Sequence, residues 1–124
     1  MNLMIAIAAG GAIGALLRFW MSTAVYAVLG RAFPYGTLAV NVVGSLLMGL
    51  LTIWLLERTS AGPAARAFLL IGLLGAFTTF STFSIETMTL VESGQIVKAV
   101  FNAVLSVGLC VTAAAFGLLL GRQL

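Results

Sequence analysis

The sequence predicts an all-α integral membrane protein in which each subunit has four transmembrane helices and the third helix is broken. The composition favours this fold, because 62% of the 124 residues are hydrophobic and only 7% are charged. The apolar residues form four runs near the length of about 20 residues that a spanning helix needs. Short connections rich in Gly, Pro and charge separate these runs. We therefore expect one membrane domain, residues 1–124, with helices at approximately 3–29, 38–56, 67–90 and 96–120.

The first helix, 3–29, begins without charge. A cleaved signal peptide starts with a positive region, and no charged residue precedes Arg18, so we expect this segment to be retained. Arg18 itself lies within the span, where a charge is costly. Two interpretations stay open for it: its long stem carries the guanidinium to a membrane interface, or it attracts an anion at the mouth of a pore.

Small residues four positions apart recur along the spans. Such spacing lets helices approach closely, either within one subunit or between two. The pairs are Gly10 and Gly14, Ser45 and Gly49, and Gly117 and Gly121. Their number predicts tight helix packing. The small size of the subunit favours a dimer, because four short helices barely enclose a polar path.

Uncharged polar residues form lines in the second and fourth helices. Asn41 and Ser45 share one face of the second helix, and Asn102 and Ser106 share one face of the fourth, with Cys110 continuing the line. Lipid offers these side chains no partner, so they face other helices or a water-filled path. Each line has two interpretations, hydrogen bonding between helices or a hydrophilic track through the membrane.

The third helix contains the stretch GAFTTFSTFSIE, Gly75 to Glu86, in which five of twelve residues are hydroxyls and three are phenylalanines. Gly75 and the adjacent Thr78 and Thr79 do not favour an uninterrupted helix, and Thr is an acceptable N-cap. We expect the helix to break near 75–79. Broken helices at membrane depth expose backbone carbonyls that bind cations and positive helix ends that attract anions.

Beyond the expected break, each face of the helix has its own chemistry. Phenylalanines recur every three residues at Phe77, Phe80 and Phe83. Phenylalanines usually pack in a core, which is one interpretation; in the other, rings turned edge-on present an electropositive edge that can contact a small anion while attracting no cation. A second face holds Thr79, Thr82 and Glu86, and a third face holds Ser81 and Ser84. Hydroxyl donors bind an anion without a fixed positive charge that would retain it.

The basic residues are scattered, so the net charge of +3 does not indicate a nucleic-acid partner. Four spans put Arg58, Arg66 and Arg122 on one side of the membrane and Arg31 and Lys98 on the other, with Arg18 inside its span. Excess Lys and Arg in loops normally fixes the direction of insertion. The near balance predicts insertion both ways round, and hence an antiparallel dual-topology homodimer.

An enzyme is excluded on the residue inventory. The chain has no His or Asp, no metal-ligand cluster and no phosphate-binding loop, so transport is passive or ion-coupled. A negative-inside potential of 100 mV would drive an anion outwards with about 2.3 kcal/mol per charge.

Three motifs together resemble the Fluc (CrcB) fluoride channels: GAFTTFSTFSIE, GGAIGALLRFW at Gly10 to Trp20, and PYGTLAVNVVGSLLMG at Pro34 to Gly49. The resemblance covers nearly the whole chain. It implies an antiparallel homodimer with two fluoride pores in the bacterial inner membrane. It also implies the function, export of cytoplasmic fluoride that protects the cell from fluoride toxicity.

The resemblance also implies roles for single residues. Phe80 and Phe83 would present ring edges to fluoride, and Asn41 would supply the pore amide. Backbone carbonyls of Gly75 and Thr78, from both subunits, would bind a structural sodium ion. Further pore residues would be Ser81, Thr82, Asn102 and Ser106, although some relatives have a tyrosine where this chain has Asn102. For Glu86 we expect a hydrogen-bonded structural role, because an ionised carboxylate repels anions.

Two alternative functions belong to other classes of membrane protein. Small dual-topology proton-coupled exporters depend on an acidic residue in the first helix, where this chain has Arg18 and no acidic residue before Glu57. A non-transport membrane scaffold would use its polar lines only between helices and would show no ion flux.

Overall fold

The computed structural model describes residues 2–124, and helices are the regular secondary structure over them, without a strand. Four helices are long and apolar enough to cross a membrane: Leu3–Leu29, Tyr35–Arg58, Pro63–Glu92 and Ile96–Gln123. The elements are α1 (Leu3–Leu29), α2 (Tyr35–Ile53), the π-helical η1 (Trp54–Arg58), α3 (Pro63–Arg66), the π-helical η2 (Ala67–Leu74), α4 (Gly75–Phe77), α5 (Phe80–Glu92) and α6 (Ile96–Gln123). The predicted four-span architecture is confirmed, and the chain is a multi-pass membrane protein.

The first helix has the bounds that its apolar run predicts, and the other three spans extend beyond theirs. The second span begins at Tyr35 and continues to Arg58, and the third begins at Pro63, where the fixed φ of proline suits the first helical turn. Polar and small residues continue a helix once it has begun, so counting apolar residues alone underestimates its length. Gly30 and Gly94, with φ of 81° and 79°, adopt the left-handed conformation where α1 and α5 end.

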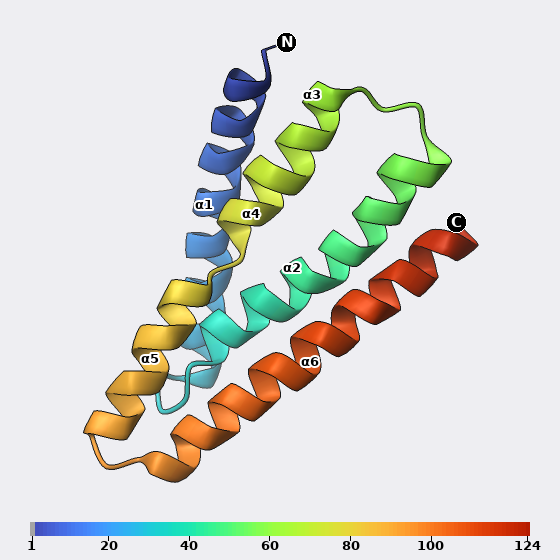
Figure 1. Ribbon diagram of the computed structural model, residues 1–124. Coiled ribbons are helices and arrows are strands. Elements are labelled where there is room, and N and C mark those ends of the chain that lie inside the picture. The colour runs from blue at the N-terminus through green and yellow to red at the C-terminus, as the bar shows by residue number, and fades with distance from the viewer. Residues whose placement is uncertain (1) are drawn as a thin grey trace.

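The four spans pack as two pairs. Figure 1 shows α2 and α6 side by side along most of their length, while α1 lies beside the third span. Both termini lie at the same end of the bundle as α3, and the connections α1–α2 and α5–α6 lie at the opposite end. The third span is divided between α4 and α5, and the chain is visibly bent there.

Glycines allow backbone-to-backbone contact in both pairs. A Cβ added at Gly10 or Gly14 would collide with carbonyl oxygens of η2, and one added at Gly72 would lie 2.6 Å from the Ile7 oxygen. A Cβ at Gly49 or Gly117 would collide in the same way across the α2–α6 contact. Each of the three small-residue pairs thus has at least one glycine in close contact within the subunit.

Little of the subunit is an apolar core. Most large apolar side chains face outwards, as lipid-facing or partner-facing residues do, and the largest side chains with almost no exposed surface are Leu74, Val40 and Asn102. One of these three is an amide. Polar contacts between helices therefore contribute to the interior of this bundle as well as apolar packing.

We predict that Gly10→Ala lowers the free energy of unfolding of the protein by about 1–3 kcal/mol, the usual cost of overpacking. The added methyl would lie 2.9 Å from the Leu73 nitrogen, which belongs to rigid backbone. Gly11→Ala is the matched control, since its methyl would meet only the Gly72 oxygen at 4.0 Å. Denaturation in detergent would measure both variants, and equal stability of the two would contradict the predicted packing.

Candidate functional site

The third span breaks at Thr78 and Thr79. Helix α4 ends at Phe77, both threonines are extended, with φ and ψ of −87° and 160° for Thr78 and −153° and 119° for Thr79, and α5 begins at Phe80. The Thr79 hydroxyl accepts a hydrogen bond from the Thr82 N–H at 3.2 Å and so caps α5. The break predicted near 75–79 is confirmed.

Asn41 on α2 holds the break in place. Its Nδ2 donates to the Thr79 carbonyl at 2.9 Å, and the Thr79 N–H donates to its Oδ1 at 2.8 Å. The Asn41 amide thus supplies the acceptor for the Thr79 N–H and the donor for the Thr79 carbonyl that the backbone would supply in a continuous helix. Each amide nitrogen has two hydrogens, so Asn41 retains one N–H beyond this pair.

The break leaves the carbonyls of Gly75 and Thr78 without their usual helical donors. Those donors would be the N–H groups of Thr79 and Thr82, which bind Asn41 Oδ1 and Thr79 Oγ1 instead. Neutral backbone oxygens at a broken helix suit a hard monovalent cation such as sodium. The two predicted carbonyl ligands are therefore compatible with the ion that the resemblance implies.

The phenylalanines of the stretch divide at the break. Phe80 is 77% exposed and Phe83 is half-buried, and their ring centroids lie 5.3 Å apart with the planes tilted by 49°. Phe77 precedes the break and is buried, near the position where Gly44 allows close approach. The expectation of a three-residue stripe beyond the break is wrong for Phe77, because the extended threonines separate it from the other two rings.

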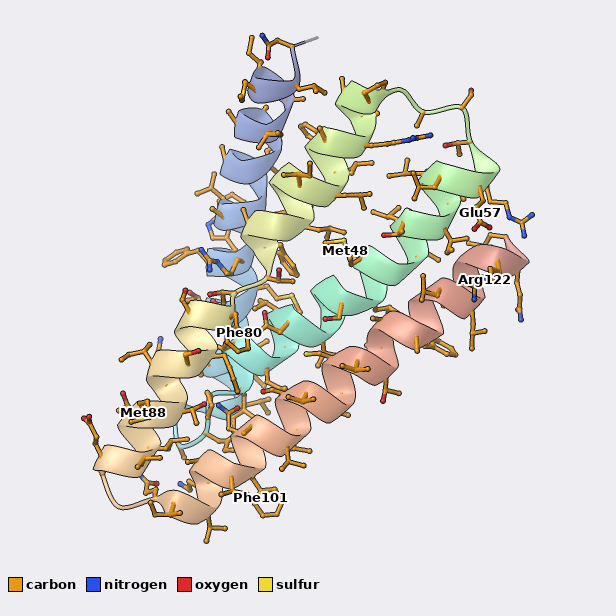
Figure 2. All side chains as sticks on the ribbon, viewed as in Figure 1. Met48, Glu57, Phe80, Met88, Phe101 and Arg122 are labelled. Atoms are coloured by element: carbon orange, nitrogen blue, oxygen red, sulfur yellow. The ribbon has the colours of Figure 1, made fainter. Side chains whose placement is uncertain are left out.

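A cavity of about 360 Å³ lies where α2, α5 and α6 meet the break. Figure 2 shows Phe80 beside the break and Met48 on α2. The cavity is lined by Asn41, Gly44, Ser45, Met48, Thr78, Thr79, Phe80, Phe83, Ser106, Val107, Cys110, Val111 and Ala114. None of these side chains is charged. The cavity therefore combines phenyl rings with neutral hydrogen-bond donors.

The predicted residues of α6 occupy two different positions. Ser106 lines the cavity, whereas Asn102 does not and is only 2% exposed. Asn102 Nδ2 donates to Thr87 Oγ1 on α5 at 2.9 Å, and its Oδ1 accepts a long bond of 3.4 Å from the Ser106 hydroxyl. Asn102 therefore lies behind the cavity wall.

The predicted hydroxyls of α5 lie in its first turn. Ser81 is exposed and Thr82 is half-buried, and neither is among the residues that line the cavity of the single chain. Thr82 Oγ1 accepts a hydrogen bond from Thr79 Oγ1 at 3.0 Å. Both residues directly follow Phe80, which does line the cavity.

A second hollow, of about 210 Å³, lies toward the α1–α2 connection and contains Glu86. Tyr26 Oη donates to Glu86 Oε2 at 2.9 Å, and the Arg31 guanidinium lies 4.4 Å from the centre of the Tyr26 ring. Glu86 Oε1 is buried and has no hydrogen-bond partner within residues 2–124. Glu86 thus has a structural partner on α1.

Arg18 is half-buried in the middle of α1. Its guanidinium makes no side-chain hydrogen bond or ion pair with any of residues 2–124. A charge at this depth is costly unless something outside the single chain compensates it.

Reasoning from the sequence missed Tyr26 and Thr87. Their hydrogen-bond partners, Glu86 and Asn102, are 60 and 15 positions away. A signal existed for Thr87, because it follows Phe83 at helical spacing on a polar helix. No signal in the sequence pairs Tyr26 with Glu86.

Comparisons with known proteins agree over the whole chain. Residues 5–118 match the family described as CrcB-like protein, Camphor Resistance (CrcB). A protein from Magnetococcus marinus, named fluoride-specific ion channel FluC, is 54% identical over 116 residues, which are 94% of each chain. A protein of the same name from Coxiella burnetii is 49% identical over 125 residues, covering all of both chains.

A third relative is longer. The fluoride-specific ion channel FluC of Methylococcus capsulatus is 53% identical over 125 residues, which cover this whole chain and 55% of that protein. The chain thus spans about half the length of that relative and nearly all of the other two. Since the family match covers most of the sequence and the relatives are about half identical across it, the chain belongs to the CrcB family.

Proposed function

We propose that this chain forms a passive, fluoride-selective ion channel that exports cytoplasmic fluoride and protects the cell from its toxicity. The observation that carries the proposal is the uncharged cavity at the helix break, lined by Phe80, Phe83 and neutral donors. Relatives about half identical to the chain are named fluoride-specific ion channels, which supports the same function.

The cavity chemistry favours a small anion over a cation. The electropositive edges of Phe80 and Phe83 attract an anion. The second N–H of Asn41 can donate to it, and the Ser106 hydroxyl, whose bond to Asn102 is long at 3.4 Å, can turn towards it. Ser81 and Thr82 supply further hydroxyls in the first turn of α5, directly after Phe80. No fixed positive charge in this set would hold the ion too tightly to be released.

A passive path suffices for export. Fluoride enters from acidic surroundings as neutral HF and dissociates in the more alkaline cytoplasm. The negative-inside potential then drives the anion outwards with about 2.3 kcal/mol per charge per 100 mV. The channel would therefore act in the bacterial inner membrane without ATP or a coupled ion.

The functional unit is proposed to be an antiparallel dual-topology homodimer with two pores. Two features of the single chain support a missing partner: Phe80 is 77% exposed next to the cavity, and Arg18 is uncompensated at mid-membrane. A second copy in the opposite orientation would cover both. The near balance of basic residues between the two ends supports insertion both ways round.

A structural sodium ion is proposed at the centre of this dimer. Its ligands would be the carbonyl oxygens of Gly75 and Thr78 from both subunits, and it would stabilise the assembly by neutralising the dipoles of these exposed carbonyls. The proposal is supported by the hydrogen bonds that both carbonyls lose at the break, where the N–H groups of Thr79 and Thr82 bind other acceptors.

Purified protein in liposomes should release fluoride rapidly and chloride much more slowly, with valinomycin-carried potassium balancing charge. Phe80→Ile and Phe83→Ile should each reduce fluoride release about tenfold, equivalent to losing about 1.4 kcal/mol of stabilisation of the ion. Phe101→Ile is the control, because Phe101 is exposed on α6 and does not line the 360 Å³ cavity. Fluoride and chloride electrodes would record both fluxes.

Fluoride flux that requires a proton gradient would instead support a coupled exporter. No flux from a correctly assembled wild-type dimer would refute the channel and favour the scaffold.

Reporters of inside and outside location, fused to the C-terminus, should both be active in the same cells if orientation is mixed. Adding positive charge to one end should bias insertion. The double variant Ser93→Lys/Gln95→Lys should therefore move the C-terminus to the outer side. If the C-terminus of the wild-type chain is found on one side of the membrane only, the proposed antiparallel dimer is refuted.

Sodium should raise the melting temperature of the purified dimer in detergent, by about 2–4 °C for each kcal/mol of binding free energy. Potassium at equal ionic strength is the control, because the two salts screen charge equally. Identical melting curves in the two salts would count against the sodium site and would leave the proposed anion path unaffected.

A further inference from the structure

We propose that Thr87 and Asn102 form a side-chain bridge that fixes the distance between two walls of the cavity and thereby determines anion selectivity. Both are positioning residues, since neither lines the cavity. The inference rests on the proposed channel function and assigns residues to the selectivity of that same path.

Helix α5 needs such a bridge because apolar packing holds it weakly. Leu90 is its only buried residue among the 13 from Phe80 to Glu92. Its firm attachments to the rest of the subunit are polar: Asn41 binds the Thr79 backbone before its start, and Tyr26 binds Glu86. Asn102 adds the attachment to α6, halfway along the helix.

The bridge is directional and connects one cavity wall to the other. Ser106 donates to Asn102 Oδ1 at 3.4 Å, Asn102 Nδ2 donates to Thr87 Oγ1 at 2.9 Å, and the Thr87 hydroxyl donates to the Phe83 carbonyl at 2.8 Å. The single hydroxyl proton of Thr87 is thus used on α5, which leaves its lone pairs to accept from Asn102. The bond that crosses from α6 to α5 is the one from Asn102 to Thr87, while the longer Ser106 bond lies within α6.

The residues at both ends of this series of hydrogen bonds, Phe83 and Ser106, line the cavity. Phe83 contributes a ring from α5, and Ser106 contributes a hydroxyl from α6. The amide between them is 2% exposed, so water does not compete for its hydrogen bonds. Cutting the bridge would let α5 move from α6, and a wider gap would admit a larger anion such as chloride.

The discriminating measurement is the ratio of chloride to fluoride flux from liposomes. A variant that merely folds poorly lowers both fluxes together, because fewer channels are active, and leaves the ratio unchanged. Thr87→Val keeps the shape of the side chain and removes the hydroxyl. We expect it to raise the chloride-to-fluoride ratio about threefold to tenfold, the range for one interhelical hydrogen bond in a membrane. Thr87→Ser restores the hydroxyl and should restore the wild-type ratio.

Thr89→Val is the matched control. Thr89 bonds back to the Ile85 carbonyl at 2.8 Å, as Thr87 does to Phe83, but it is exposed and has no hydrogen bond to α6. A ratio altered as much by Thr89→Val as by Thr87→Val would overturn the proposal, and so would an unaltered ratio in Thr87→Val.

Asn102→Leu completes a double-mutant cycle. Since it cuts the same bridge, its effect and that of Thr87→Val should not add. Effects that multiply in the double variant would show two independent roles and overturn the bridge. Should Thr87→Val fail to assemble, Asn102→Ala removes the donor and is measured in its place with the same expectation.

Amide hydrogen exchange in detergent tests the bridge without ion flux. Thr87→Val should speed exchange along α5 about threefold to tenfold, while Thr89→Val should not. A wild-type protein that conducts no fluoride would refute the proposed function. The exchange rates would then decide by themselves whether the bridge holds α5.

Discussion

The structure depends on one constraint, that backbone polar groups inside a bilayer find no water and must be satisfied by the protein. A continuous helix meets this constraint alone, but the third span does not, because Thr78 and Thr79 are extended. Asn41 resolves the break with two hydrogen bonds to the backbone of Thr79. The amide of α2 thus allows non-helical backbone at membrane depth, and with it the exposed carbonyls and the cavity.

The same constraint explains where the polar side chains lie. Apolar packing distinguishes poorly between helix positions when lipid is as apolar as the helices themselves, so buried polar pairs and close glycine contacts specify the arrangement. The pair α2–α6 relies on glycines such as Gly49 and Gly117. Helix α5 has no such contact and relies on Tyr26, Asn41 and Asn102, one from each of the other three spans.

The sequence predicted properties that follow from local chemistry. Hydropathy predicted four spans, and the helix-breaking residues predicted the break and a threonine cap, which the structure places at Thr79. It could not predict contacts that depend on how helices rotate about their axes. Helical spacing put Asn102 and Ser106 on one face, and they do share a hydrogen bond, but only the packing of α6 on α2 decides that Ser106 enters the cavity and Asn102 lies behind it.

The hydroxyls of the third span differ in what they can offer a passing ion. Thr78, Ser84, Thr87 and Thr89 each donate to a carbonyl one helical turn earlier, so their only proton is committed and their lone pairs can only accept hydrogen bonds. Thr82 accepts from Thr79 and keeps its own proton available. Donors for an anion are therefore concentrated in the first turn of α5, where the helix end is also positive. A segment rich in oxygen along its whole length thus keeps its free hydroxyl protons at one end, in the first turn of α5.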